Sequence, residues 1–108
     1  MSSATADEAL KSLVAGVPIP LLLIDEADRI LATNDAAVRL FGPAVEARHY
    51  LTVIRQPAVT SCIEATRRTA RETQGRMLIA GPSLDRSFRV VTTPVLDRRV
   101  LVSLEEIT

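Results

Sequence analysis

The chain has 108 residues, 47% of them hydrophobic and 24% charged, which is typical of one globular domain and not of a disordered segment. Thirteen basic residues balance thirteen acidic ones, so no net charge favours nucleic acid or a membrane surface as a partner. Three aromatic residues are too few for a base-stacking platform, and one cysteine excludes an internal disulfide.

The longest apolar stretch is too short to cross a membrane. It runs from Val17 to Ile24 and is interrupted by Pro18 and Pro20, whereas a bilayer needs about 20 residues. No signal peptide is visible, and the single cysteine fits a reducing compartment. We expect a cytoplasmic domain without direct membrane contact, and we leave open that a longer parent chain is anchored in the inner membrane.

The N-terminal segment has the pattern of an amphipathic helix. Apolar residues recur at helical spacing over residues 6–15, behind a capping box predicted from Thr5 and Glu8. We therefore expect residues 1–16 to form an N-terminal cap or dimerisation helix, and residues 20–108 to form the core of a single domain.

Two short strands and a capped helix are expected next. The aliphatic run Leu21 to Asp25 predicts a strand that is buried on both faces. A polar turn then leads to a second strand, Ile30 to Thr33, which pairs with the first as a hairpin. Asn34 is expected to cap a short helix that ends at Gly42.

The second half reads as helix followed by sheet. One helical turn is expected near residues 50–54, and Pro57 suits the first position of a longer helix that ends before Gly75. Three strands are expected after it, at residues 76–79, 87–93 and 100–105. Short turns between successive strands predict an α+β fold with an antiparallel sheet covered by helices on one side.

Several strands carry apolar residues on both faces, so the outer face of the sheet needs a cover. The N-terminal helix can supply Leu10, Leu13 and Val14, with Leu22 and Leu101 beneath them. It has only about three turns, at 3.6 residues a turn. We therefore expect a second copy of the chain to complete the cover, with these five residues at a homodimer interface.

The sequence resembles a PAS domain. The resemblance lies in the strand Leu21–Asp25, in the N-x-A-A-x-x-L-F-G segment from Asn34 to Gly42, and in the closing Glu106-Ile107-Thr108, where Glu106 replaces the usual Asp. It covers essentially residues 1–108. It implies a five-stranded antiparallel sheet in the order 2-1-5-4-3, with an N-terminal helix before the PAS core.

A narrower resemblance concerns residues 47–59. The segments Ala47–Tyr50 and Ile54–Val59 are similar to phosphate-regulon (PhoR-type) sensor histidine kinases, although Ala47 replaces their Gly. This resemblance implies a sensory and dimerisation module of a two-component sensor histidine kinase. It also implies downstream phosphoacceptor and kinase domains in a phosphate-responsive parent, and an accessory regulator protein as a further partner.

No residue pattern predicts catalysis, a cofactor or a metal site within the chain. His49 is the only histidine and lacks neighbours at ligand spacing, so a structural role is favoured over a metal or haem ligand. Cys62 lies on an apolar helix face, which favours a core thiol over a nucleophile or a flavin-reactive group. Arg67, Arg68 and Arg71 favour a solvated face over an anion or acidic-partner site.

A second hypothesis is a small-molecule receptor with its ligand in the core. The lining would be Val38, Phe41, Ile54, Ile63, Phe88 and Val90. This lining is aliphatic or aromatic and lacks the polar groups that normally orient a ligand, so a filled core is favoured. A stand-alone enzyme that uses His49 or Cys62 is the third and least favoured hypothesis.

Overall fold

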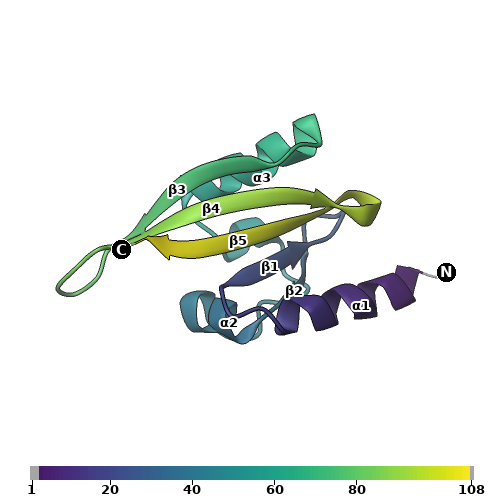
Figure 1. Ribbon diagram of the computed structural model, residues 1–108, viewed down its shortest axis with the longest axis horizontal. Coiled ribbons are helices and arrows are strands. Elements are labelled where there is room, and N and C mark those ends of the chain that lie inside the picture. The colour runs from purple at the N-terminus through teal and green to yellow at the C-terminus, as the bar shows by residue number, and fades with distance from the viewer. Residues whose placement is uncertain (1–2, 108) are drawn as a thin grey trace.

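The computed structural model describes the backbone of residues 3–107 and the side chains of residues 8–107 (Figure 1). It contains ten elements between Ser3 and Ile107. In chain order they are α1 (Ser3–Ala15), β1 (Leu21–Ile24), β2 (Ile30–Thr33), α2 (Asp35–Phe41), the 3₁₀ helix η1 (Tyr50–Thr52), α3 (Pro57–Thr69), β3 (Thr73–Ile79), β4 (Arg86–Val95), the 3₁₀ helix η2 (Leu96–Arg98) and β5 (Arg99–Ile107).

One five-stranded sheet organises the molecule. Its strand order is β2-β1-β5-β4-β3 and all four pairings are antiparallel, which confirms the predicted α+β fold and topology. The long strands β4 and β5 form its centre, joined by a tight hairpin (Figure 1). The first strand, β1, lies directly beside the last, β5.

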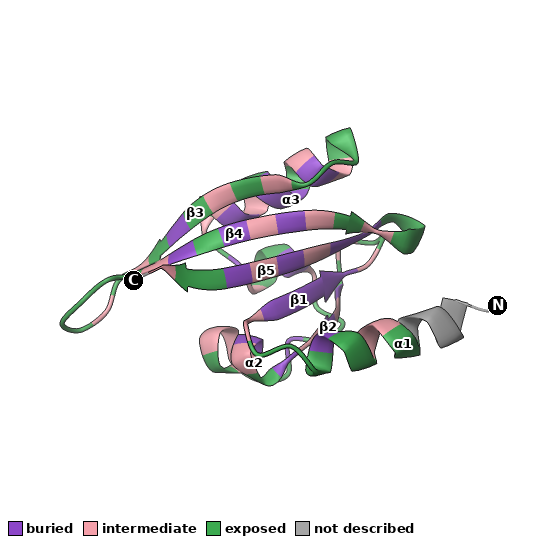
Figure 2. Cartoon of the chain, viewed as in Figure 1, coloured by how far each residue is buried: buried purple, intermediate pink, exposed green. Residues whose placement is uncertain are grey.

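The sheet separates two hydrophobic clusters. Along β4, buried residues alternate with less buried ones, because successive side chains point to opposite faces of the sheet (Figure 2). The main core lies between the sheet and the α2, η1 and α3 side, and includes Leu22, Ile54, Ile63 and Phe88. The smaller cluster lies on the opposite face, where Val14 of α1 packs on β1 and β2. Helices therefore cover both faces of the sheet, although α1 covers only part of the outer face.

The predicted end of α3 at Gly75 is wrong. The helix ends at Thr69, and Ala70 follows it in the left-handed region with φ 55°. Gly75 lies inside β3, where a Cβ atom would stand 2.8 Å from the Sγ atom of Cys62. The missing Cβ atom therefore lets α3 pack close to the sheet. From the sequence alone, this packing role of Gly75 is mistaken for the end of the helix.

The N-terminal helix α1 starts earlier in the chain than the predicted capping box. It begins at Ser3, so Thr5 lies within the helix and the predicted capping box is wrong. The side chains of Thr5 and Ala6 lie outside the described residues. None of the helices formed by residues 3–107 is long and apolar enough to span a membrane.

Candidate functional site

An apolar groove runs between α1 and the outer face of the sheet. Val14 and Leu23 are buried there, and Leu101 is half-buried. Leu13 beside them is 68% exposed. The groove has a volume of about 130 Å³, close to the roughly 150 Å³ cavity that holds one benzene. It is lined by Leu10, Leu13, Val14, Val17, Leu21, Leu23, Val95 and Leu101.

The prediction for Leu22 is wrong, because this side chain belongs to the main core. Leu22 pairs with Val102 in the sheet, is 0% exposed and faces away from α1. Its neighbour Leu23 pairs with Leu101 and supplies the outer surface under α1. Side chains alternate between the faces of a strand, so a one-residue error moves a residue to the other face.

Two ion pairs flank the groove-lining residues Val95 and Leu101 along the strand pair β4–β5. Arg89 and Glu105 form an ion pair at 3.3 Å near the start of β4. At the other end of the strand pair, the buried Arg99 lies 3.2 Å from the carboxylate of Asp97. An apolar centre with a polar border is the usual composition of a protein–protein interface.

The predicted core-pocket residues are brought together with one exception. Ile54, Ile63, Phe88 and Val90 are at most 2% exposed and belong to the main core, and Phe41 packs against it. Val38 is half-buried and lies outside this cluster. The short α2 instead directs Ala37, Leu40 and Phe41 toward the core.

Asn34 connects the linker after α1 to the rest of the fold. Its side-chain oxygen accepts hydrogen bonds from the N–H groups of Ala37 (3.0 Å) and Leu21 (3.1 Å), which confirms the predicted cap of α2. Its side-chain nitrogen donates to the main-chain oxygens of Val17 (2.8 Å) and Ile19 (2.6 Å). One buried side chain thus fixes both α2 and the segment that leads from α1.

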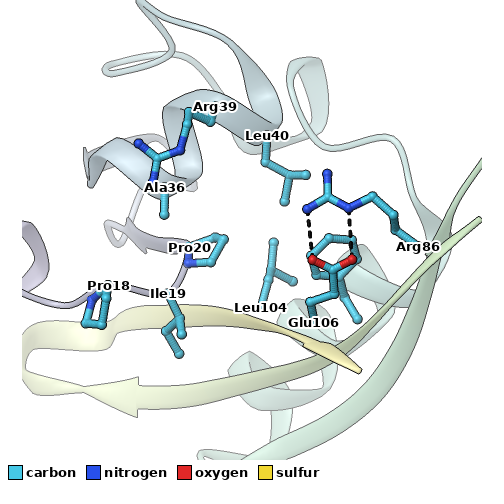
Figure 3. A pocket seen from close by; sticks show the side chains of 10 residues that line it. Pro18, Ile19, Pro20, Ala36, Arg39, Leu40, Arg86, Leu104 and Glu106 are labelled. Atoms are coloured by element: carbon cyan, nitrogen blue, oxygen red, sulfur yellow. Dashed lines mark hydrogen bonds and ion pairs between the residues drawn. The ribbon is translucent and has the colours of Figure 1, made fainter. Parts of the chain in front are cut away.

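A bidentate ion pair joins the start of β4 to the end of β5 (Figure 3). The Nε and Nη2 atoms of Arg86 each lie 3.0 Å from a carboxylate oxygen of Glu106. The hydrogen bond from Arg86 lowers the pKa of Glu106, and the same bond raises the pKa of Arg86. The Arg86 guanidinium also lies 5.1 Å from the centre of the Phe88 ring. Glu106 therefore forms a regular ion pair although it stands where Asp is usual.

The surroundings of Cys62 and His49, the two candidate reactive side chains, indicate structural roles. Cys62 is 4% exposed, and burial raises the pKa of its thiol, which disfavours the nucleophilic thiolate. The Nδ1 atom of His49 accepts a hydrogen bond from the N–H of Leu51 at 3.2 Å, and the ring stacks on Tyr50. Residues 8–107 contain no cluster of three or more His, Cys, Asp or Glu side chains suited to a metal ion.

Arg67 connects three parts of the fold instead of facing solvent. It forms an ion pair with Asp28 at 2.9 Å, and its guanidinium donates to the main-chain oxygens of Asp25 and Arg98. It thus joins α3 to the β1–β2 turn and to the β4–β5 hairpin. Of the three arginines weighed as an anion site, only Arg68 and Arg71 remain exposed.

Residues 8–74 match the family model of the PAS domain, which is more than half of the chain. The chain belongs to the PAS domain family. This PAS domain is similar in structure to that of BvgS from Bordetella pertussis, with 20% identity, 94% of this chain and 84% of that chain covered, and a TM-score of 0.65.

Two further solved structures resemble this PAS domain. The photoactive yellow protein domain of the sensor histidine kinase Ppr from Rhodospirillum centenum is 12% identical, with a TM-score of 0.70. The match covers 94% of this chain and 97% of that domain. A PAS domain from a two-component sensor histidine kinase is 13% identical, with a TM-score of 0.64. The match covers 98% of this chain and 100% of that chain. No curated protein sequence matches this chain. At these identities, the structural similarity shows a shared fold only. The function has to be inferred from the residues of the site.

Proposed function

We propose that this PAS domain is the sensory and dimerisation module of a two-component sensor histidine kinase. It would relay a signal to a downstream phosphoacceptor and kinase domain, in the cytoplasm, and do no chemistry itself. The transferase activity would belong to the parent protein. Two of the similar structures are domains of sensor histidine kinases, which supports this assignment.

The observation that carries the proposal is the apolar groove beside an exposed leucine. Leu13 projects next to a groove of about 130 Å³. A second copy related by two-fold symmetry presents the same helix and the same groove, so each Leu13 can fill the groove of the partner. We therefore propose a homodimer in which Leu10, Leu13, Val14 and Leu101 lie at the interface.

The groove also provides a route for the signal. Its lining includes Val14 of α1 and Leu101 of β5, so a shift of α1 changes the packing of the strand that leads to the C-terminus. A stimulus that favours one packing over another would bias the downstream domains. Coupling of this kind typically amounts to about 1–3 kcal/mol.

We also propose the phosphate-responsive subtype, with an accessory regulator protein as partner and a parent anchored in the inner membrane. The proposal rests on residues 47–59. Ala47 stands where the resembling kinases have Gly, and it adopts φ 69°, a conformation that favours glycine. Deleting the parent gene should abolish the transcriptional response to phosphate starvation, and an unchanged response would contradict the subtype.

A chimeric kinase tests the main proposal. This domain would replace the PAS domain of a sensor histidine kinase, and autophosphorylation from ATP would be measured. We expect Leu13→Glu to change the rate about fivefold or more. Leu84→Glu, at a leucine that is 79% exposed in the β3–β4 loop, should leave the rate unchanged. Equal rates in the two variants would contradict the proposal.

A further inference from the structure

A pocket of about 350 Å³ opens between α2, the linker after α1 and the ends of β4 and β5 (Figure 3). This volume lies at the lower end of the range for small-molecule sites. Seven of its ten lining residues are apolar. Two of them, Phe88 and Leu104, belong to the main core and are at most 2% exposed. Of the six residues predicted to line a core pocket, only Phe88 also lines this one.

Three charged side chains border the pocket and leave it with one net positive charge. Arg86 is already paired with Glu106 through Nε and Nη2. Arg39 is exposed on α2 and has no ion-pair partner among residues 8–107. Figure 3 shows Arg39 and Arg86 on opposite sides of the pocket, with Leu40 between them and Pro20 below Arg39.

We propose that this pocket binds a small organic monocarboxylate. The carboxylate pairs with the guanidinium of Arg39, and the apolar body of the ligand packs on the partly exposed Ile19, Pro20 and Leu40. One unpaired cation next to an apolar surface favours a ligand with one negative charge and a hydrophobic group over inorganic phosphate, which carries no apolar part.

The position of the pocket would couple such a ligand to both ends of the domain. The main-chain N–H of Leu104 in β5 donates to the main-chain oxygen of Pro20, the last residue of the linker, at 3.0 Å. Both residues line the pocket. A bound ligand therefore contacts the segment from α1 and the strand that leads to the C-terminus. This regulatory consequence rests on the proposed sensory function, whereas the binding itself does not.

NMR titration of the 108-residue chain tests the binding. Benzoate and 4-methylpentanoate serve as probes, and benzamide and 4-methylpentanamide are their neutral counterparts. We expect saturable shifts of the amide signals around the pocket at about 1 mM carboxylate, and binding of the amides weaker by about tenfold. Amides that bind as tightly as the acids, or no saturation by either acid at about 10 mM, would overturn the proposal.

Two arginine variants make the test specific. Arg39→Gln should weaken carboxylate binding about tenfold or more, because a charge-assisted hydrogen bond is lost. Arg68→Gln, at an exposed arginine on α3, should bind like the unmodified chain. Equal weakening in both variants would overturn the site.

Hydrogen exchange of the Leu104 amide distinguishes ligand binding from its proposed coupling to the signal. A saturating carboxylate should slow exchange of this amide. Binding without slower exchange would keep the site but remove its coupling to the signalling route.

Discussion

The side-chain nitrogen of Asn34 donates a hydrogen bond to the main-chain oxygen of Ile19 at 2.6 Å. Asn34 is 3% exposed and opens α2, whereas Ile19 lies in the linker that follows α1. The same amide also bonds to Val17. The position of α1 on the sheet therefore depends on a residue outside both elements.

Replacing Asn34 should destabilise the domain and loosen α1. Asn34→Ala removes a helix cap and leaves buried main-chain groups unpaired, so we expect the free energy of unfolding to fall by about 2–4 kcal/mol. Asn34→Ser keeps an oxygen for the cap but loses the donor to the linker, and should cost less. Urea unfolding measures the difference, and equal losses in both variants would show that the cap oxygen contributes nothing.

Gly75→Ala should be destabilising because of one neighbour. The added Cβ atom would stand 2.8 Å from the Sγ atom of Cys62, and overpacking of this kind costs about 1–3 kcal/mol. A double-mutant cycle with Cys62→Ala gives the pairwise term. The alanine at position 75 should cost clearly less when Cys62 is also alanine, and an identical cost in both backgrounds would refute this contact.

The β4–β5 hairpin has two consecutive residues in the left-handed region, Asp97 at φ 61° and Arg98 at φ 62°. Tight hairpins of this kind prefer Asp-Gly, because glycine adopts this conformation without steric cost. Arg98→Gly should therefore raise the free energy of unfolding by about 0.5–1 kcal/mol in thermal or urea unfolding. Arg76→Gly, inside β3, should lower it by a similar amount. A loss of stability in Arg98→Gly would contradict this account.

The Arg86–Glu106 pair predicts a pH effect at the end of β5. The hydrogen bond from Arg86 lowers the pKa of Glu106. The pair therefore contributes stability above the pKa of the unfolded carboxyl group, and this contribution is lost as the pH falls through the folded pKa. Carbon-13 NMR of the carboxyl group should show a higher midpoint in Arg86→Met. A midpoint that does not move would exclude Arg86 as the cause.

The sequence was sufficient for the fold because its local signals agree with one another. The hairpin of residues 21–33, the Asn34 cap and the last three strands are each read from neighbouring residues, and short turns then determine an antiparallel sheet. The assignment of Leu22 failed for a physical reason. All four residues of β1 are buried, so no alternation indicates which of them faces α1.

Contacts between distant residues left no signal in the sequence. Cys62 explains Gly75 only when α3 is placed on the sheet. Arg67 and Asp28 are 39 positions apart, and only the fold shows that Arg67, of the three arginines weighed as an anion site, forms this ion pair. The pocket beside Arg39 likewise combines four segments of the chain.

Sedimentation equilibrium of the 108-residue chain tests the central claim most directly. The apolar groove predicts a particle of twice the 11.7 kDa chain mass, reduced to a single chain by Leu13→Glu and unaffected by Leu84→Glu. An unmodified chain that remains at 11.7 kDa at every concentration, with α1 still packed on the sheet, would contradict the claim that a second copy fills this groove.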